Sequence, residues 1–139
     1  MASERLNVVL VVLGGTRAER LSCAGYARET TPFLDQVARD GVRFAHTIAA
    51  APGTLSAHAS LFTGLYAVTH AATDEHRVLS DRHPVLSEYL KAAGYRTAAF
   101  CTNPWVSPAT GFGRGIDAFF TQRYHNHLAT RAVLIGRRV

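Results

Sequence analysis

A chain of 139 residues with 47% apolar residues is long enough to bury a core, which excludes a disordered polypeptide. The formal charge is +5 and the sequence pI is near 9.8. Because the basic residues are scattered and only Arg137 and Arg138 form a tight pair, we expect no nucleic-acid partner and favour an anionic small molecule.

Cysteine usage and the N-terminal residues bear on the compartment. Cys23 and Cys101 are too few and too far apart for a disulfide framework or a zinc site, so we expect free thiols. The apolar run from Leu6 to Leu13 is shorter than a membrane-spanning helix and lacks a small-residue cleavage site. These features predict a cytoplasmic protein with no membrane partner.

Residues 7–13 are a valine- and leucine-rich run bounded by Gly14 and Gly15. Such a run predicts a strand of a parallel sheet that is buried on both faces. Ligands of open α/β sheets gather outside the carboxyl ends of the strands, so the positions after Leu13 are where a catalytic carboxylate is expected. Farther on, the residues from Pro32 to Gly41 predict an amphipathic helix, and residues 42–49 a short strand or an extended segment.

Residues 51–64 combine a Pro52-Gly53 break with a run of hydroxyl side chains and one imidazole. This pattern predicts a loop leading into a helix, with Thr54 as its N-cap and Gly64 as its stop. A helix N-terminus favours an anion, so a hydroxyl there suits a nucleophile toward a phosphate- or sulfate-like group. A plain threonine cap is the alternative, and position alone favours it.

The segment 65–82 is polar and irregular, and its acidic and histidine residues resemble a metal cluster, although a solvated loop is the better interpretation. Residues 84–94 predict a helix, and Tyr95 to Cys101 a second buried strand. Trp105 suits either a pocket lining or core packing, and core packing is favoured. The spaced glycines of residues 111–115 lack the context of a cofactor loop.

Residues 122–135 predict a helix, on which His125 and His127 would lie on different faces and could not share a ligand. No internal repeat is present. We therefore expect one domain over residues 1–139.

The sequence TLSAHASLFTGLY at residues 54–66 resembles the nucleophile segment of the sulfatases within the alkaline phosphatase superfamily. The order and spacing of further segments resemble the same family: residues 7–13, 17–23, 30–35, 41–44, 92–98 and 111–117. The resemblance implies an α/β three-layer sandwich with a mostly parallel sheet. Because the family's catalytic domain is several times longer, it also implies a truncated, N-terminal portion of that domain.

The resemblance puts Thr54 in the nucleophile position and His58 where the family motif has an arginine, and these two are the candidate catalytic residues. Type I sulfatases oxidise a cysteine or serine to formylglycine. Because threonine cannot form that aldehyde hydrate, phosphate esters are favoured over sulfate esters.

Active members of the family hold a calcium- or magnesium-like divalent cation with an aspartate directly after the first strand, and the matching residue here is Gly14. A hydrogen atom cannot coordinate a cation, and Glu19 matches a position that is not a ligand. The family's distal ligands also have no counterpart before Val139. We therefore assign no metal ligand and do not expect this chain alone to bind the cation.

Together these features predict a sulfatase-like hydrolase of sulfate or phosphate esters with impaired activity. The alternative is a non-catalytic remnant or binding domain with the same fold. A truncated sheet would leave apolar surface exposed, so a homodimer or a complementing chain is expected as partner.

Overall fold

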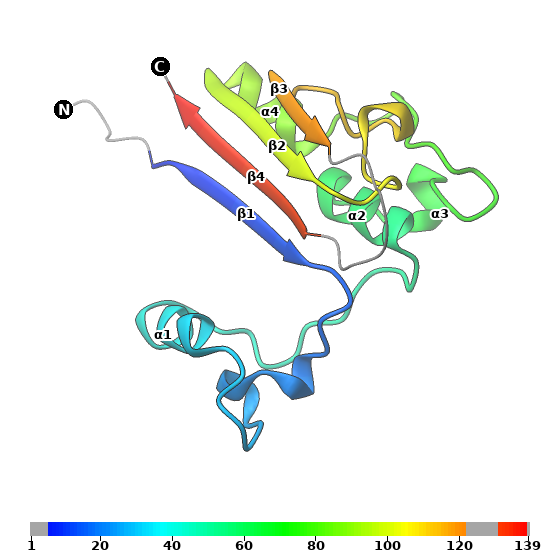
Figure 1. Ribbon diagram of the computed structural model, residues 1–139. Coiled ribbons are helices and arrows are strands. Elements are labelled where there is room, and N and C mark those ends of the chain that lie inside the picture. The colour runs from blue at the N-terminus through cyan, green and yellow to red at the C-terminus, as the bar shows by residue number, and fades with distance from the viewer. Residues whose placement is uncertain (1–5, 122–130, 139) are drawn as a thin grey trace. The chain divides into compact units, whose positions relative to one another are not determined.

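A computed structural model describes residues 6–121 and 131–138, which fall into two compact units (Figure 1). The first unit comprises residues 1–14 and 49–139, and the second comprises residues 15–48. The single domain expected from the sequence stays a prediction, because a compact unit is defined by contacts alone.

The first unit contains a four-stranded sheet in the order β1-β4-β2-β3. Its strands are β1 (Val8–Leu13), β2 (Tyr95–Cys101), β3 (Ala118–Thr121) and β4 (Arg131–Arg138). β2 pairs with β3 in parallel, whereas β4 is antiparallel to both β1 and β2. The predicted strands at 7–13 and 95–101 are therefore confirmed and run in the same direction, and β4 between them makes the sheet mixed.

The helix predicted over residues 122–135 is wrong for its last five residues, which belong to β4. The register places Leu134 between Leu10 of β1 and Ala99 of β2, so this backbone is paired on both sides. Such pairing overrides a local helix preference, particularly in a segment that contains the β-branched Val133 and Ile135. His125 and His127, which were predicted to lie on different faces of that helix, are outside the described residues.

Helices α2 (Thr54–Thr63), α3 (Ala67–His70) and α4 (Leu86–Ala92) complete the first unit (Figure 1). The predicted helix at 84–94 is confirmed, and the chain leaves it through Gly94 at a φ of 81°. The core joins buried residues of α2 and β2 to those of the loops: Leu55, Ala59, Ala72, Leu79, Val85, Cys101, Val106 and Phe112. The helices therefore cover one face of the sheet.

The opposite face of the sheet carries exposed apolar side chains. Val9 and Val11 of β1 are 58% and 53% exposed, and Phe100 and Phe120 stack on each other with centroids 4.6 Å apart. The expectation that β1 is buried on both faces is thus wrong, because no element described in residues 6–121 and 131–138 of this unit covers these side chains. The described part of this unit therefore has two layers, the sheet and the helices on one of its faces.

The second unit consists of two 3-10 turns, at Ala18–Arg20 and Ser22–Ala24, and the predicted helix α1 (Pro32–Asp40). Thr31 precedes α1, and its hydroxyl accepts a hydrogen bond from the Ser22 backbone N–H at 3.2 Å and donates to Asp35 at 3.2 Å. Hydrogen bonding from the Ser22 hydroxyl lowers the pKa of Asp35. Residues 41–48 form neither helix nor strand, so the predicted short strand is wrong.

The described residues include both cysteines and the helices named above. Cys23 and Cys101 are free, and burial raises the pKa of the Cys101 thiol. Of the helices in the described ranges, none has the length and apolar character needed to cross a membrane.

Candidate functional site

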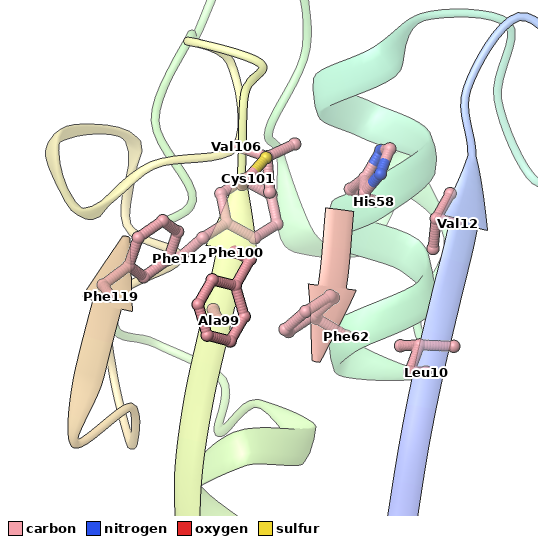
Figure 2. A pocket seen from close by; sticks show the side chains of 10 residues that line it. All are labelled: Leu10, Val12, His58, Phe62, Ala99, Phe100, Cys101, Val106, Phe112 and Phe119. Atoms are coloured by element: carbon pink, nitrogen blue, oxygen red, sulfur yellow. The ribbon is translucent and has the colours of Figure 1, made fainter. Parts of the chain in front are cut away.

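The direction of α2 determines where Thr54 lies. Figure 2 shows His58 beside Val12 and Phe62 beside Leu10, in the layer between α2 and the sheet. Since β1 advances from Leu10 to Val12 while α2 advances from His58 to Phe62, the helix runs opposite to β1. α2 therefore begins at the carboxyl ends of β1 and β2, which is the edge of the sheet predicted for the ligand.

Thr54 is the first residue of α2, and its predicted role as N-cap is wrong. Gly53 is the N-cap, with an extended backbone at φ −84° and ψ 146°, and it makes no side-chain cap hydrogen bond. The Thr54 side chain is exposed, and in the described part of the chain its hydroxyl makes no hydrogen bond. This hydroxyl is therefore available to a ligand.

A polar cavity of about 160 Å³ lies beside this hydroxyl. It is lined by Thr54, Leu55, Thr73, Asp74, Arg77 and Trp105. The Arg77 guanidinium carbon is 5.1 Å from the centroid of the Trp105 ring, and its Nε donates to the Asp74 carbonyl oxygen at 2.9 Å. Trp105 is 41% exposed, so the favoured core-packing role is wrong and the pocket-lining alternative holds.

His58 does not line this polar cavity. Its Nδ1 lies 2.7 Å from the Thr54 carbonyl oxygen and must carry the proton, because a carbonyl only accepts. The ring lines a smaller apolar cavity of about 20 Å³ and meets Phe112 edge-on, with centroids 6.5 Å apart (Figure 2). The two candidate catalytic residues are thus joined through the backbone of Thr54 rather than through its hydroxyl. A catalytic role for His58 stays a prediction.

His70 is a buried, hydrogen-bonded residue at the end of α3. It is 1% exposed, and its Nδ1 accepts the Ala72 backbone N–H at 3.1 Å. The neutral ring then donates from Nε2 to the Ser60 hydroxyl at 3.0 Å. Burial lowers the pKa of His70, so the ring favours this neutral form and ties α2 to the segment after α3.

The described residues do not fit the family's cation. Gly14 follows β1 in an exposed turn and offers no side-chain oxygen. The segments 6–121 and 131–138 contain no group of three or more His, Cys, Asp or Glu side chains placed to hold a metal ion. Calcium takes six to eight oxygen ligands, and magnesium demands an octahedral set. Glu19 lies in the second unit, where Arg17 donates to its carboxylate at 2.6 Å.

The glycine-spaced segment 111–115 supports the loop that carries Arg77. Arg114 donates from Nη1 to Glu88 and the His83 carbonyl, and from Nη2 to the Ser80 carbonyl, each at 3.1 Å. Gly111 has a φ of 90°, and a Cβ there would lie 2.1 Å from the Leu79 carbonyl oxygen. The glycines of this segment therefore permit close backbone packing.

Sequence reasoning missed Arg77 as a site residue. It lies in the polar segment 65–82, which has no periodicity, and only the fold brings it to Trp105 and Thr54. A lone arginine in such a segment carries no distinguishing sequence signal.

A family model described as "Sulfatase" matches residues 6–132. The chain is similar to an ulvan-active sulfatase of Formosa agariphila, at 32% identity over 66% of this chain and 18% of the relative. It is also similar to the multifunctional alkaline phosphatase superfamily protein PehA of Trinickia caryophylli, at 34% identity over 68% of this chain and 19% of the relative. An N-acetylglucosamine-6-O-sulfatase of Bacteroides thetaiotaomicron is 24% identical over 79% of this chain and 20% of the relative.

The chain thus spans about a fifth of the length of these curated relatives. No solved structure matches it.

Proposed function

Because the chain belongs to the sulfatase family, we propose that it binds the anionic group of a phosphate or sulfate ester beside Thr54, with Thr54 in the nucleophile position. The observation that carries this proposal is the polar cavity shared by the Thr54 hydroxyl and the Arg77 guanidinium. Thr54 begins a ten-residue helix whose first N–H groups also favour negative charge. Arginine is well suited to the oxygens of such an ester.

The side chain of residue 54 favours phosphate over sulfate. Threonine cannot form the aldehyde hydrate on which type I sulfatases depend, so attack would come from the Thr54 hydroxyl itself. In that step the Thr54 oxygen forms the bond to phosphorus while the ester oxygen leaves and takes up a proton, and the hydroxyl proton passes to a base. Water then attacks the phosphorus, which releases inorganic phosphate and restores the Thr54 hydroxyl. His58 is hydrogen-bonded to the Thr54 carbonyl oxygen instead of the hydroxyl, so it is poorly placed to accept the proton of that hydroxyl.

We further propose that hydrolysis by this chain is slow. Gly14 supplies no carboxylate at the end of β1, and His58 stands where the family motif has an arginine. The cation that such a carboxylate would help to hold, and the arginine of the motif, would both neutralise the developing negative charge. Their loss should slow the reaction, because electrostatic stabilisation is usually a large part of catalysis.

Release of 4-nitrophenol from 4-nitrophenyl phosphate and 4-nitrophenyl sulfate tests this proposal. We expect slow turnover of the phosphate ester that Thr54→Ala abolishes, while Thr69→Ala, an exposed threonine of α3 outside the cavity, leaves it unchanged. Equal rates for the wild type and Thr54→Ala would exclude Thr54 as the nucleophile.

The second candidate is a non-catalytic binding or interaction domain that keeps the fold. It is favoured by Gly14 and by the exposed apolar face that carries Val9 and Val11. Binding of a phosphate ester without any Thr54-dependent turnover would support this candidate over the enzyme.

A further inference from the structure

We propose that Arg77, positioned by Trp105, is the specificity-determining residue of the Thr54 cavity, and that the ligand carries a planar ring next to its phosphate- or sulfate-type group. The inference depends on the proposed function only for the place of the ligand, beside Thr54.

The Arg77 guanidinium is held in place and still has hydrogen-bond donors for a ligand. Its Nε donates to the Asp74 carbonyl oxygen at 2.9 Å, and its guanidinium carbon lies over the Trp105 ring, 5.1 Å from the centroid. In the described ranges its two terminal nitrogens make no hydrogen bond, whereas both terminal nitrogens of Arg114 are bonded to loop carbonyls or Glu88. Arg114 is thus a structural residue, and Arg77 keeps two donors for the paired oxygens of an oxyanion.

The backbone at Trp105 is anchored by its own loop. Its backbone N–H donates to the Asn103 side chain at 2.9 Å, and the next residue, Val106, is 3% exposed in the core. The indole is nevertheless 41% exposed and lines the cavity together with Arg77. A partly exposed indole beside the oxyanion donors offers an apolar surface on which an aromatic ring of the ligand packs.

Asp74 adds a negative charge to the same cavity. Its Oδ1 lies 3.5 Å from the point that a Cβ on Gly53 would occupy, so the carboxylate is next to the start of α2. Its charge opposes an anion, whereas its carbonyl oxygen holds Arg77. Neutralising the Asp74 side chain should therefore strengthen anion binding, whereas neutralising Arg77 should weaken it. A matched charge change outside the cavity separates this local effect from a nonspecific attraction to a basic protein.

Trp105 is the only tryptophan of the chain, so its fluorescence reports directly on this cavity. We would titrate the full chain with phenylphosphonate and with methylphosphonate, whose P–C bonds are not hydrolysed. Arg77→Gln should raise the dissociation constants of both phosphonates about tenfold. Asp74→Asn should lower both dissociation constants. Arg82→Gln is the control, because it removes a positive charge, as Arg77→Gln does, from an exposed turn of the same segment, and it should change neither constant.

The ring preference is tested with Trp105→Leu, measured by calorimetry because the fluorophore is lost. The wild type should prefer phenylphosphonate to methylphosphonate about threefold, and the variant should lose this preference. Equal effects of Arg77→Gln and Arg82→Gln, or a ring preference that survives Trp105→Leu, would overturn the inference.

Failure of this inference is distinguishable from failure of the proposed function, since neither phosphonate is turned over. Arg77-dependent binding without Thr54-dependent ester hydrolysis supports the inference and contradicts the enzyme. Thr54-dependent hydrolysis with binding that ignores Arg77 does the reverse.

Discussion

The Lys91 ammonium lies 2.7 Å from the Asp117 carboxylate and joins α4 to the residue before β3. The same carboxylate accepts the Thr97 backbone N–H at 2.9 Å, and the Asp117 backbone N–H donates to the Thr97 carbonyl at 3.0 Å. Hydrogen bonding from Lys91, followed by that from Thr97, lowers the pKa of Asp117 to about 2. One carboxylate therefore fixes α4, β2 and β3 together.

This carboxylate predicts an acid-sensitive contribution to stability. Because the pKa of Asp117 is lower in the folded chain than its usual 3.8, its contribution is present above about pH 4 and is lost as the pH falls toward 2. Asp117→Asn should lower the thermal midpoint at pH 7, and the difference from the wild type should shrink below pH 4. Asp81→Asn, at an exposed turn, is the matched control and should change little. A difference that does not depend on pH would contradict the ion pair.

Gly115 is predicted to be essential for packing of the glycine-spaced segment. Its φ is 68°, and a Cβ there would lie 2.4 Å from the Glu88 nitrogen. Gly64 has a similar φ of 72° but nothing within 4 Å of the position that a Cβ would take. A substitution there therefore measures the cost of the positive φ alone. Gly64→Ala should cost about 1 kcal/mol in the free energy of unfolding, and Gly115→Ala about 3 kcal/mol or more. Urea unfolding measures both, and equal costs would contradict the predicted overlap.

A metal prediction follows from Gly14. We expect the chain to show no tight binding of Ca²⁺ or Mg²⁺ in calorimetric titrations. We expect Gly14→Asp to gain affinity once the missing family ligands are supplied in trans, because one hard oxygen donor is restored at the end of β1. Stoichiometric binding by the unsubstituted chain would show that other residues replace the lost carboxylate. If Gly14→Asp binds no cation even with the complementing segment, then more than this one carboxylate is missing from the site.

The exposed sheet face predicts self-association. Val9 and Val11 lie on β1, an edge strand of the described sheet that contains no charged residue. We expect a second copy of the chain to cover this apolar face, giving a concentration-dependent sedimentation coefficient in the micromolar range. The double substitution Val9→Thr and Val11→Thr should weaken association, whereas Val68→Thr, 92% exposed on α3, should not. A chain that stays monomeric at these concentrations and unfolds cooperatively would contradict self-association through this face.

The elements that the sequence predicts well are those with local signals. α1 has Pro32 at its start, α4 is followed by Gly94, and β1 and β2 are short apolar runs bounded by turn residues. β4 was missed because its residues 131–138 also suit a helix, and only pairing with β1 and β2 decides the outcome. Exposure of Val9 and Val11 was missed because an apolar run shows what a strand can bury and not what covers it.

The site was partly predictable for the same reason. A Pro-Gly break followed by hydroxyl residues locates Thr54 at a helix start, which is a local property. The partners Arg77 and Trp105 come from two separate loops and meet Thr54 only through the fold. The orientation of His58 was also beyond the sequence, because its Nδ1 bonds to the carbonyl of residue 54 and its ring turns toward Phe112.

The central claim is that an oxyanion binds beside Thr54 and Arg77. Amide chemical shifts of the ¹⁵N-labelled chain, titrated with inorganic phosphate in the presence of EDTA, test it most directly. We predict saturable shifts at the amides of Thr54 and Leu55 and at the side-chain Nε–H of Arg77, all of which vanish in Arg77→Gln. The absence of saturable shifts at these positions, or shifts that persist in Arg77→Gln, would contradict the claim.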